Sequence, residues 1–358
     1  MTKEKNKIIY LEILRIIAAF FVIFNHTGND GFFLFSLKSS NHLPFWIYAF
    51  ISVFCKFAVP LFFMISGSLY LKRDNLTIKE IYLKRILKIF IITLVFSTIY
   101  YLYLNHLKNV DISFLSYLKQ LITCGISSHF WYLYMYIIFL MTLPFLKIIV
   151  NNMDHKLFNY LIIIMLIFDG IIPIINFLIF KEELTFYRLL TPIWALNIVF
   201  IYPIVGYYLD NKIDLSQHQK RIIPLWIINI ILIIITCLMT KYHANIIHVL
   251  SEKTSQIFYN NFVIINAITI FLTIKYLTPN NKFNSILAKT GKYTFGIYLF
   301  HILVMKTPYF NDFITHLKDI NLNTGLIALI MCLTTYIISF IITFAISNIP
   351  FLKKLVGF

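Results

Sequence analysis

Long apolar runs, separated by short stretches of charged and turn-forming residues, recur along the whole chain. A helix needs about 20 apolar residues to cross a bilayer, whereas the strands of a membrane barrel alternate apolar and polar positions. Because these runs are continuous, the pattern predicts an all-α, polytopic membrane protein with about ten transmembrane helices. They are expected near residues 8–28, 45–71, 84–104, 130–150, 157–180, 189–209, 222–241, 258–278, 290–307 and 323–349.

The composition and the distribution of basic residues support this topology. Hydrophobic residues make up 59% of the chain and charged residues 13%, and the mean hydropathy is +0.80. Most lysines and arginines fall on the loops that share a side with the two termini, and such loops are typically cytoplasmic. Both termini are therefore expected in the cytoplasm. The outer segment 105–129 is long enough for a short re-entrant or interfacial helix.

The N-terminal run begins after basic residues, as a signal peptide does. Glu12 and Arg15 interrupt it, however, and no small-residue cleavage site follows, so we expect a retained first helix. The sequence contains no clear linker or repeat. Residues 1–358 are expected to form one transmembrane domain, with no fused extracytoplasmic domain.

The formal net charge of +16 is spread over many loops. This spread favours membrane topology over a nucleic-acid partner and leaves open the binding of anionic phosphates at the cytoplasmic face. The four cysteines are far apart and form neither a disulfide framework nor a zinc pattern, so no metal is expected.

Three ionisable residues interrupt the first apolar run, whose sequence at 10–28 is YLEILRIIAAFFVIFNHTG. An ionisable side chain near the bilayer centre costs about 2.5–3.5 kcal/mol on insertion scales, so it normally faces the interior of the bundle. Glu12 and Arg15 have the spacing of a helical ion pair. Arg15 and His26 are about three turns apart and share a face, separated by about 16 Å. Simpler interpretations are an Arg15 that reaches cytoplasmic headgroups and a His26 at the membrane interface.

These residues resemble the first helix of the integral-membrane acyltransferase 3 family, in which an arginine, ten residues and a histidine follow one another. The family has an acidic residue three positions before the arginine, more often aspartate than the Glu12 found here. The segment KFAVPLFFMISGSLYL (56–71) is similar to its second helix. There Lys56 is a second cation inside the membrane, either in an ion pair or in contact with a ligand, and Ser66–Ser68 permits close helix packing.

Three further segments are similar to the same family. YLKRILKIF (82–90) resembles its basic motif, with Arg85 in place and with Lys88 where the family has a second arginine. A lysine lacks the guanidinium fork that binds a phosphate with two hydrogen bonds. The alternative interpretation of this segment is an anchor at the membrane surface. HFWYLYMYIIFLMTLPFL (129–146) places His129 and Trp131 at the outer interface, followed by tyrosines that favour an aromatic belt. GKYTFGIYLFHILVM (291–305) carries His301 and two glycines expected to serve packing.

The resemblance implies transfer of an acyl group, usually acetyl, from cytoplasmic acetyl-coenzyme A (acetyl-CoA) to a hydroxyl of an extracytoplasmic sugar or cell-envelope glycan, in a bacterial plasma membrane. His26 is then the central catalytic group, as a general base or as a transient acyl-imidazole. Glu12 is expected to hold Arg15 or Lys56. The donor would be bound by Arg15, Arg85, Lys88 and Lys56, and His129, Trp131 and His301 are candidates for the acceptor side.

Two other functional classes fit the same sequence. Buried cations and a histidine would also suit the anion pathway of a glycan or lipid-linked-sugar flippase, and a non-catalytic membrane subunit is a third class. The acceptor could also receive its acetyl group through a separate extracytoplasmic transferase partner. The acceptor, the acyl chain length, the oligomeric state and the roles of residues 157–278 are not determined by the sequence.

Overall fold

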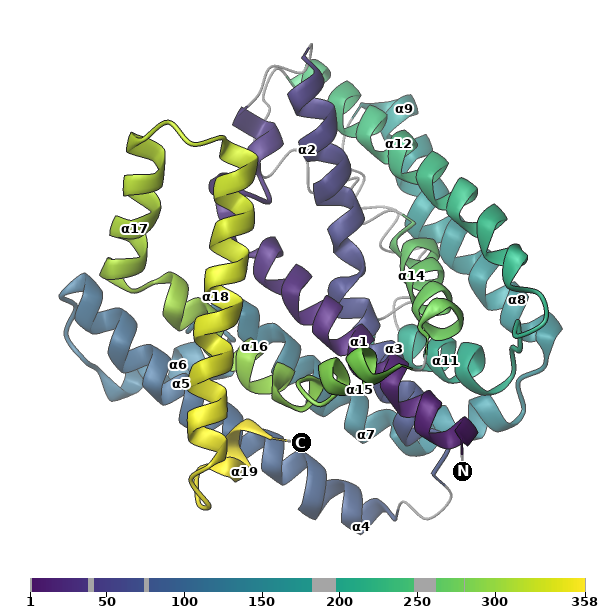
Figure 1. The fold of residues 1–358 in the computed structure, drawn as a ribbon, viewed down its shortest axis with the longest axis horizontal. Coiled ribbons are helices and arrows are strands. Elements are labelled where there is room, and N and C mark those ends of the chain that lie inside the picture. Colours follow the sequence, from purple (N-terminus) through teal and green to yellow (C-terminus); the bar gives the residue numbers. More distant parts are fainter. Residues whose placement is uncertain are drawn as a thin grey trace.

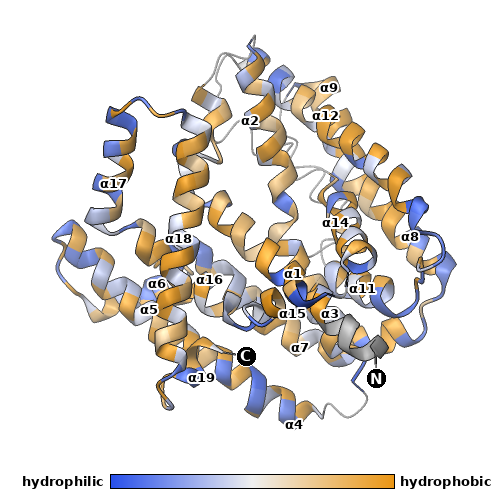
Figure 2. Cartoon of the chain, viewed as in Figure 1, coloured by the Kyte–Doolittle hydropathy of each residue, from blue (hydrophilic) through white to orange (hydrophobic). Residues whose placement is uncertain are grey.

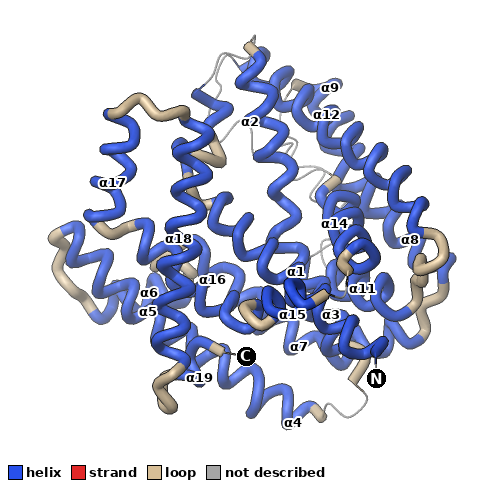
Figure 3. Tube along the Cα trace, viewed as in Figure 1, coloured by secondary structure: helices blue, strands red, loops and turns tan. Residues whose placement is uncertain are grey.

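The computed structural model of the chain describes residues 2–37, 42–73, 77–181, 198–247, 262–279 and 281–357. Every regular element within these residues is a helix (Figure 3). Six of the described segments are long and apolar enough to cross a membrane: Leu43–Tyr70, Ile78–Lys108, Ser128–Asn151, His155–Phe180, Gln219–Ile246 and Thr324–Ser347. The prediction of an all-α membrane protein is confirmed at this level, while ten spans and cytoplasmic termini stay predictions.

Most of these six segments combine more than one helical element. In each of these segments a short 3-10 or π-helical stretch is continuous with the α-helix or α-helices beside it. The segments are α2 (Leu43–Phe54), η3 (Cys55–Phe57) and α3 (Ala58–Tyr70); α4 (Ile78–Glu80), η4 (Ile81–Ile86) and α5 (Leu87–Lys108); η5 (Ser128–Phe130) and α7 (Trp131–Asn151); α8 (His155–Met165), η6 (Leu166–Ile171) and α9 (Ile172–Phe180); η7 (Gln219–Arg221) and α12 (Ile222–Ile247); and α18 (Thr324–Ser347).

Four further apolar helices correspond to the other predicted spans: α1 (Thr2–Asn25), α11 (Ile198–Asn211), α14 (Val263–Leu277) and α16 (Thr294–Met305). The predicted spans 189–209 and 258–278 begin at positions that lie outside the described residues. The outer segment 105–129 contains the short amphipathic helix α6 (Phe114–Ile122), as expected. Three short helices were not predicted: α15 (Lys282–Ala288), α17 (Pro308–Asp319) and α19 (Lys353–Val356).

Helix α1 crosses the middle of the molecule and packs against α3, α14, α16 and α18 (Figure 1). In this view α8, α9 and α12 form one edge, and α5, α6 and α17 form the other. Both chain ends lie in the lower part of the view, near α15 and α19. Hydrophobic residues run along the long helices, and hydrophilic residues gather mainly at helix ends and in loops, as a membrane requires (Figure 2).

The closest helix pair near the centre is α3 with α11, and two glycines make its close approach possible. A Cβ atom on Gly67 would collide with the backbone of Pro203, and one on Gly206 would collide with the backbone of Met64. The Ser68 hydroxyl donates to the Gly206 carbonyl at 2.9 Å. The expectation that the Ser-Gly-Ser segment permits close packing is therefore confirmed, and α3 is held firmly beside α1.

Candidate functional site

The middle of α1 carries the predicted ion pair. The Arg15 guanidinium lies 2.5 Å from the Glu12 carboxylate, and both side chains are partly buried. The 3-10 turn η8 (Gly291–Tyr293) packs directly on this pair, and a Cβ on Gly291 would collide with the Glu12 carboxylate. The expected packing role of Gly291 is therefore confirmed. Glu12 orients Arg15, whose other side faces a cavity.

His26 follows the last residue of α1, and a tight turn fixes its backbone. The amide of His26 donates to the Ile23 carbonyl at 2.9 Å. The next residue, Thr27, closes the turn: its hydroxyl donates to the Phe24 carbonyl at 2.7 Å and accepts the amide of Phe32 at 2.8 Å. The chain therefore reverses directly after His26 instead of continuing as a helix.

Three histidines from three separate helices meet at this end of α1. The His26 ring centroid lies 5.2 Å from that of His301 and 6.2 Å from that of His129, and the latter two are 5.2 Å apart. His129 is 1% exposed and His301 is fully buried, whereas His26 is partly exposed. In the described part of the chain, no group of three or more His, Cys, Asp or Glu side chains is arranged to hold a metal ion.

Each buried histidine is fixed through its Nδ1 atom. Nδ1 of His129 lies 2.8 Å from the Ser127 hydroxyl, and Nδ1 of His301 lies 2.6 Å from the Tyr298 carbonyl oxygen. The Nε2 atom of each ring is buried without a hydrogen-bond partner among the described residues. Buried polar atoms normally find partners, so these two nitrogens make the cluster a candidate site.

Two tyrosine hydroxyls lock the helices that carry these histidines. The Tyr298 hydroxyl donates to the His129 carbonyl at 2.6 Å, which ties α16 to the start of α7. The Tyr100 hydroxyl donates to the Leu299 carbonyl at 2.8 Å, which ties α5 to α16. Both rings also contact the His129 ring. The histidine cluster is thus held rigidly, as preorganised reacting groups must be.

Lys56 lies near the cluster, in the short 3-10 turn that joins α2 to α3. The 3-10 turn η3 contains Lys56, whose Nζ atom lies 4.6 Å from the centroid of the Phe32 ring. The amide of Phe32 bonds to the Thr27 hydroxyl, and Thr27 directly follows His26, so Lys56 lies near this end of α1. The side chain of Asn266 on α14 bonds to this turn, because it donates to the Phe54 carbonyl at 2.6 Å.

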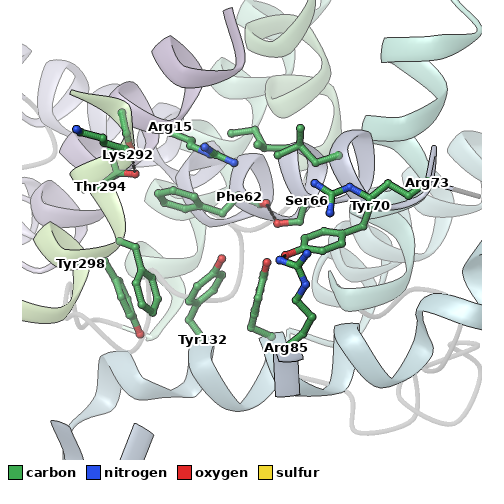
Figure 4. A pocket seen from close by; sticks show the side chains of 15 residues that line it. Arg15, Phe62, Ser66, Tyr70, Arg73, Arg85, Tyr132, Lys292, Thr294 and Tyr298 are labelled. Atoms are coloured by element: carbon green, nitrogen blue, oxygen red, sulfur yellow. Dashed lines mark hydrogen bonds between the residues drawn. The ribbon is translucent and has the colours of Figure 1, made fainter. Parts of the chain in front are cut away.

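A cavity of about 290 Å³, lined by cations and by apolar and aromatic side chains, lies on the other side of Arg15. Figure 4 shows Arg73 and Arg85 gathered around Tyr70 in one part of it and Lys292 and Thr294 in another, with Arg15 above. Each of the two guanidinium carbons lies 5.3 Å from the Tyr70 ring centroid, and Arg85 also donates to the Tyr70 hydroxyl at 3.3 Å. The cavity therefore combines fixed cations with aromatic walls.

The structure brings the sequence-predicted residues together in two groups and leaves two of them apart. Arg15 and Arg85 line the basic cavity, and His26, His129 and His301 form the histidine cluster with Lys56 beside it. Lys88 instead donates to the carbonyl of Gly357 at 2.5 Å, at the C-terminal end of the chain. Trp131 is 39% exposed at the surface.

One expectation about the aromatic segment was wrong: Tyr132 and Tyr136 line the basic cavity instead of forming an aromatic belt. His129 is buried within the bundle, and its position at the outer interface stays a prediction. Arg73, Lys292 and Tyr70 were missed as site residues, since in the sequence the two cations look like loop charges. One available signal was the position of Arg73 three residues after Tyr70, which places both near one helix end.

Comparison with known proteins gives one match. The model of a protein family described as an acyltransferase domain matches residues 8–344, which is nearly the whole chain. No curated protein and no solved structure matches the chain.

Proposed function

The chain belongs to the acyltransferase 3 family and is a membrane acyltransferase, and from that premise we propose that it moves an acetyl group from cytoplasmic acetyl-CoA to a hydroxyl of an extracytoplasmic glycan. The observation that carries this proposal is the arrangement along α1. A basic cavity lies beside Arg15, and a histidine cluster lies about 16 Å further along the helix, at His26.

The basic cavity supports binding of the donor. Coenzyme A carries several phosphate charges, and a guanidinium can hold a phosphate with two parallel hydrogen bonds. Arg73 and Arg85 on one side of the cavity and Arg15 and Lys292 on the other supply such donors. The walls include Phe62, and a slender pantetheine arm packs well on such apolar surfaces. The arm would then extend along α1 and bring the thioester to His26.

At the outer end of α1, His26 supplies the chemistry. It is the partly exposed member of the cluster, so it is the ring that substrates reach. As a general base, His26 takes the proton of the acceptor hydroxyl while the oxygen attacks the thioester carbon. As a nucleophile, it takes the acetyl group first and passes it on from an acyl-imidazole. In both routes the Lys56 cation stabilises the negative oxygen that develops on the thioester carbonyl.

Glu12 acts through Arg15 and not on the reacting atoms. By helical rise it lies about 20 Å below His26, and its carboxylate is bonded to Arg15. Its role is to keep the guanidinium turned into the donor cavity. The acceptor receives the acetyl group directly at His26 or through a separate extracytoplasmic transferase, and membrane lipid surrounds the helices.

The proposal is tested by reconstituting the purified protein in liposomes with radiolabelled acetyl-CoA. An acyltransferase releases free coenzyme A and transfers the label to glycans extracted from the cell envelope. A flippase for glycans or lipid-linked sugars would neither bind nor consume acetyl-CoA. Absence of both binding and turnover, in protein that remains folded, would reject the proposed donor.

A further inference from the structure

The His301 side chain has a defined tautomer. Its Nδ1 atom lies 2.6 Å from the Tyr298 carbonyl oxygen. A carbonyl oxygen only accepts hydrogen bonds, so Nδ1 carries the proton, and in a neutral ring Nε2 is then left as a pure acceptor. This Nε2 atom is buried and has no hydrogen-bond partner among the described residues. An acceptor left unsatisfied in the interior loses its bond to water without a replacement, which calls for a functional explanation.

The surroundings of His301 restrict what can donate to this acceptor. The ring contacts three others, those of His26, His129 and Tyr298. The Tyr298 hydroxyl already donates to the His129 carbonyl. His129 is itself fully enclosed and bonded at Nδ1 to Ser127. His26 is the one ring of the cluster that is partly exposed, and it lies 5.2 Å from His301 between centroids.

We infer that His301 is a positioning residue that accepts a hydrogen bond from His26 during the reaction, an inference that rests on the proposed acyl transfer. The His26 nitrogen that turns toward His301 must carry the proton, because Nε2 of His301 can only accept. The other nitrogen of His26 therefore keeps its lone pair for the substrate. A buried acceptor behind a reacting imidazole orients and polarises that ring in the same way in hydrolase triads.

The proton balance of this arrangement needs no further reactant. When His26 takes the proton of the acceptor hydroxyl, the hydroxyl oxygen forms the new ester bond and the thioester bond breaks. The imidazolium is stabilised by its second N–H, which points to His301. His26 then returns the proton to the departing coenzyme A thiolate, so both histidines end the cycle in their starting states.

The rigidity of α16 supports this role. The Tyr298 hydroxyl bonds α16 to the start of α7, and the Tyr100 hydroxyl bonds α16 to α5. A ring held in this way cannot turn to follow substrate, but it can hold the side chain of a neighbouring residue in one orientation. His26, which follows the last residue of α1, is that neighbour.

The inference is tested by chemical rescue of a His301→Gly variant. The substitution opens a buried space of imidazole size, and two small rings are then added: imidazole, which has an acceptor nitrogen, and pyrrole, which has the same shape and no acceptor. We expect kcat to fall by about ten- to a hundredfold, by analogy with the loss of a group that orients a metal-bound histidine. Imidazole should restore activity and pyrrole should not. Equal rescue by both rings would overturn the inference.

Phe130→Gly is the matched control for this experiment. Phe130 is a fully buried ring beside His129 and carries no nitrogen, so its removal affects packing alone. In this variant the two added rings should have the same effect. A preference for imidazole in Phe130→Gly as well would show that the ring acts elsewhere and would contradict the inference.

A second measurement reads His26 directly and does not depend on turnover. Diethyl pyrocarbonate modifies the unprotonated nitrogen of an accessible imidazole, and mass spectrometry gives its rate at His26. His301→Leu should slow this modification, and His301→Gln, which keeps an acceptor oxygen, should restore it, with the KM for acetyl-CoA unchanged in both. An unchanged rate in His301→Leu would overturn the inference. If wild-type protein shows no acetyl transfer, the proposed function fails instead, while this rate still reports on the two histidines.

Discussion

The side-chain amide of Asn266 donates to the backbone carbonyl of Phe54 at 2.6 Å and so joins α14 to the break between α2 and α3. Asn229 on α12 fixes the orientation of this amide, because it donates to the Asn266 oxygen at 3.1 Å and leaves the nitrogen to face the carbonyl. In a 3-10 turn a backbone carbonyl bonds to the amide three residues on, and its second lone pair can accept from the Asn266 side chain. Two buried asparagines therefore support the turn that presents Lys56 beside His26.

We predict that Asn266→Leu lowers both activity and stability. The loss of this hydrogen bond should destabilise the protein by about 0.6–2 kcal/mol, the range for bonds between membrane helices. The displaced Lys56 should reduce kcat by up to about a hundredfold, since a shift of about 1 Å has that effect on reacting groups. Acetyl transfer and thermal unfolding in detergent measure the two effects.

A double-variant comparison shows whether Asn266 acts through Lys56. In a Lys56→Met background, Asn266→Leu should reduce kcat little further, because the group that it positions is already gone. Fully additive losses in kcat would mean that the asparagine affects the site by another route.

The basic cavity makes different predictions for two neighbouring cations. Arg85→Ala should raise the KM for acetyl-CoA about tenfold or more, because charged hydrogen bonds contribute about 1.5–3 kcal/mol. Lys88→Ala should leave this KM nearly unchanged, since Lys88 is bonded to Gly357. Steady-state kinetics at low and high salt measure both, and the salt dependence of KM should weaken in Arg85→Ala. Equal effects of the two substitutions would contradict the location of the donor site.

The contact between α3 and α11 predicts that Gly67→Ala is destabilising. The added methyl group meets the backbone of Pro203, which cannot turn aside as a side chain can, and overpacking of this kind costs about 1–3 kcal/mol. Gly125→Ala is the control, because its nearest neighbours lie 3.3 Å or more from the added atom. Thermal unfolding should separate the two variants; the same melting temperature would argue against the tight packing of these helices.

Helical periodicity and residue type anticipated much of the site on α1. The Glu12–Arg15 pair follows from their spacing, and the position of His26 about three turns further along follows from the helical rise. The histidine cluster needed the structure, because His129 and His301 are far from His26 in the sequence and the apolar runs that carry them do not reveal which helices are neighbours. For the same reason, no role for Asn229 or Asn266 could be predicted from the sequence.

The short helices and the break at Cys55–Phe57 also required the structure. The segment from Leu43 to Tyr70 is mostly apolar, and hydropathy alone does not show where it changes from α-helix to a 3-10 turn. The contact of this turn with Asn266 comes from another helix, which a local pattern does not contain. Similarly, Lys292 resembles an ordinary loop charge until η8 brings it to the cavity.

The proposed orientation predicts the labelling of single cysteines in intact cells. In a background with the four native cysteines replaced, Asp111→Cys lies in the expected outer segment and Ser216→Cys in an expected cytoplasmic loop; both positions are exposed. A membrane-impermeant thiol reagent should label the first and not the second, and permeabilised cells should label both. The reverse pattern would place the donor cavity on the outer side and remove the route for cytoplasmic acetyl-CoA.

The central claim is that His26 carries out the transfer. The most direct measurement compares wild type with His26→Ala in liposomes, with acetyl-CoA supplied on the side of the basic cavity. Alanine is well tolerated at the end of a helix, so the variant should insert normally and bind acetyl-CoA with an unchanged affinity. The account predicts that transfer of radiolabelled acetyl groups to envelope glycans is abolished while donor binding is retained. Substantial transfer by His26→Ala would contradict the account.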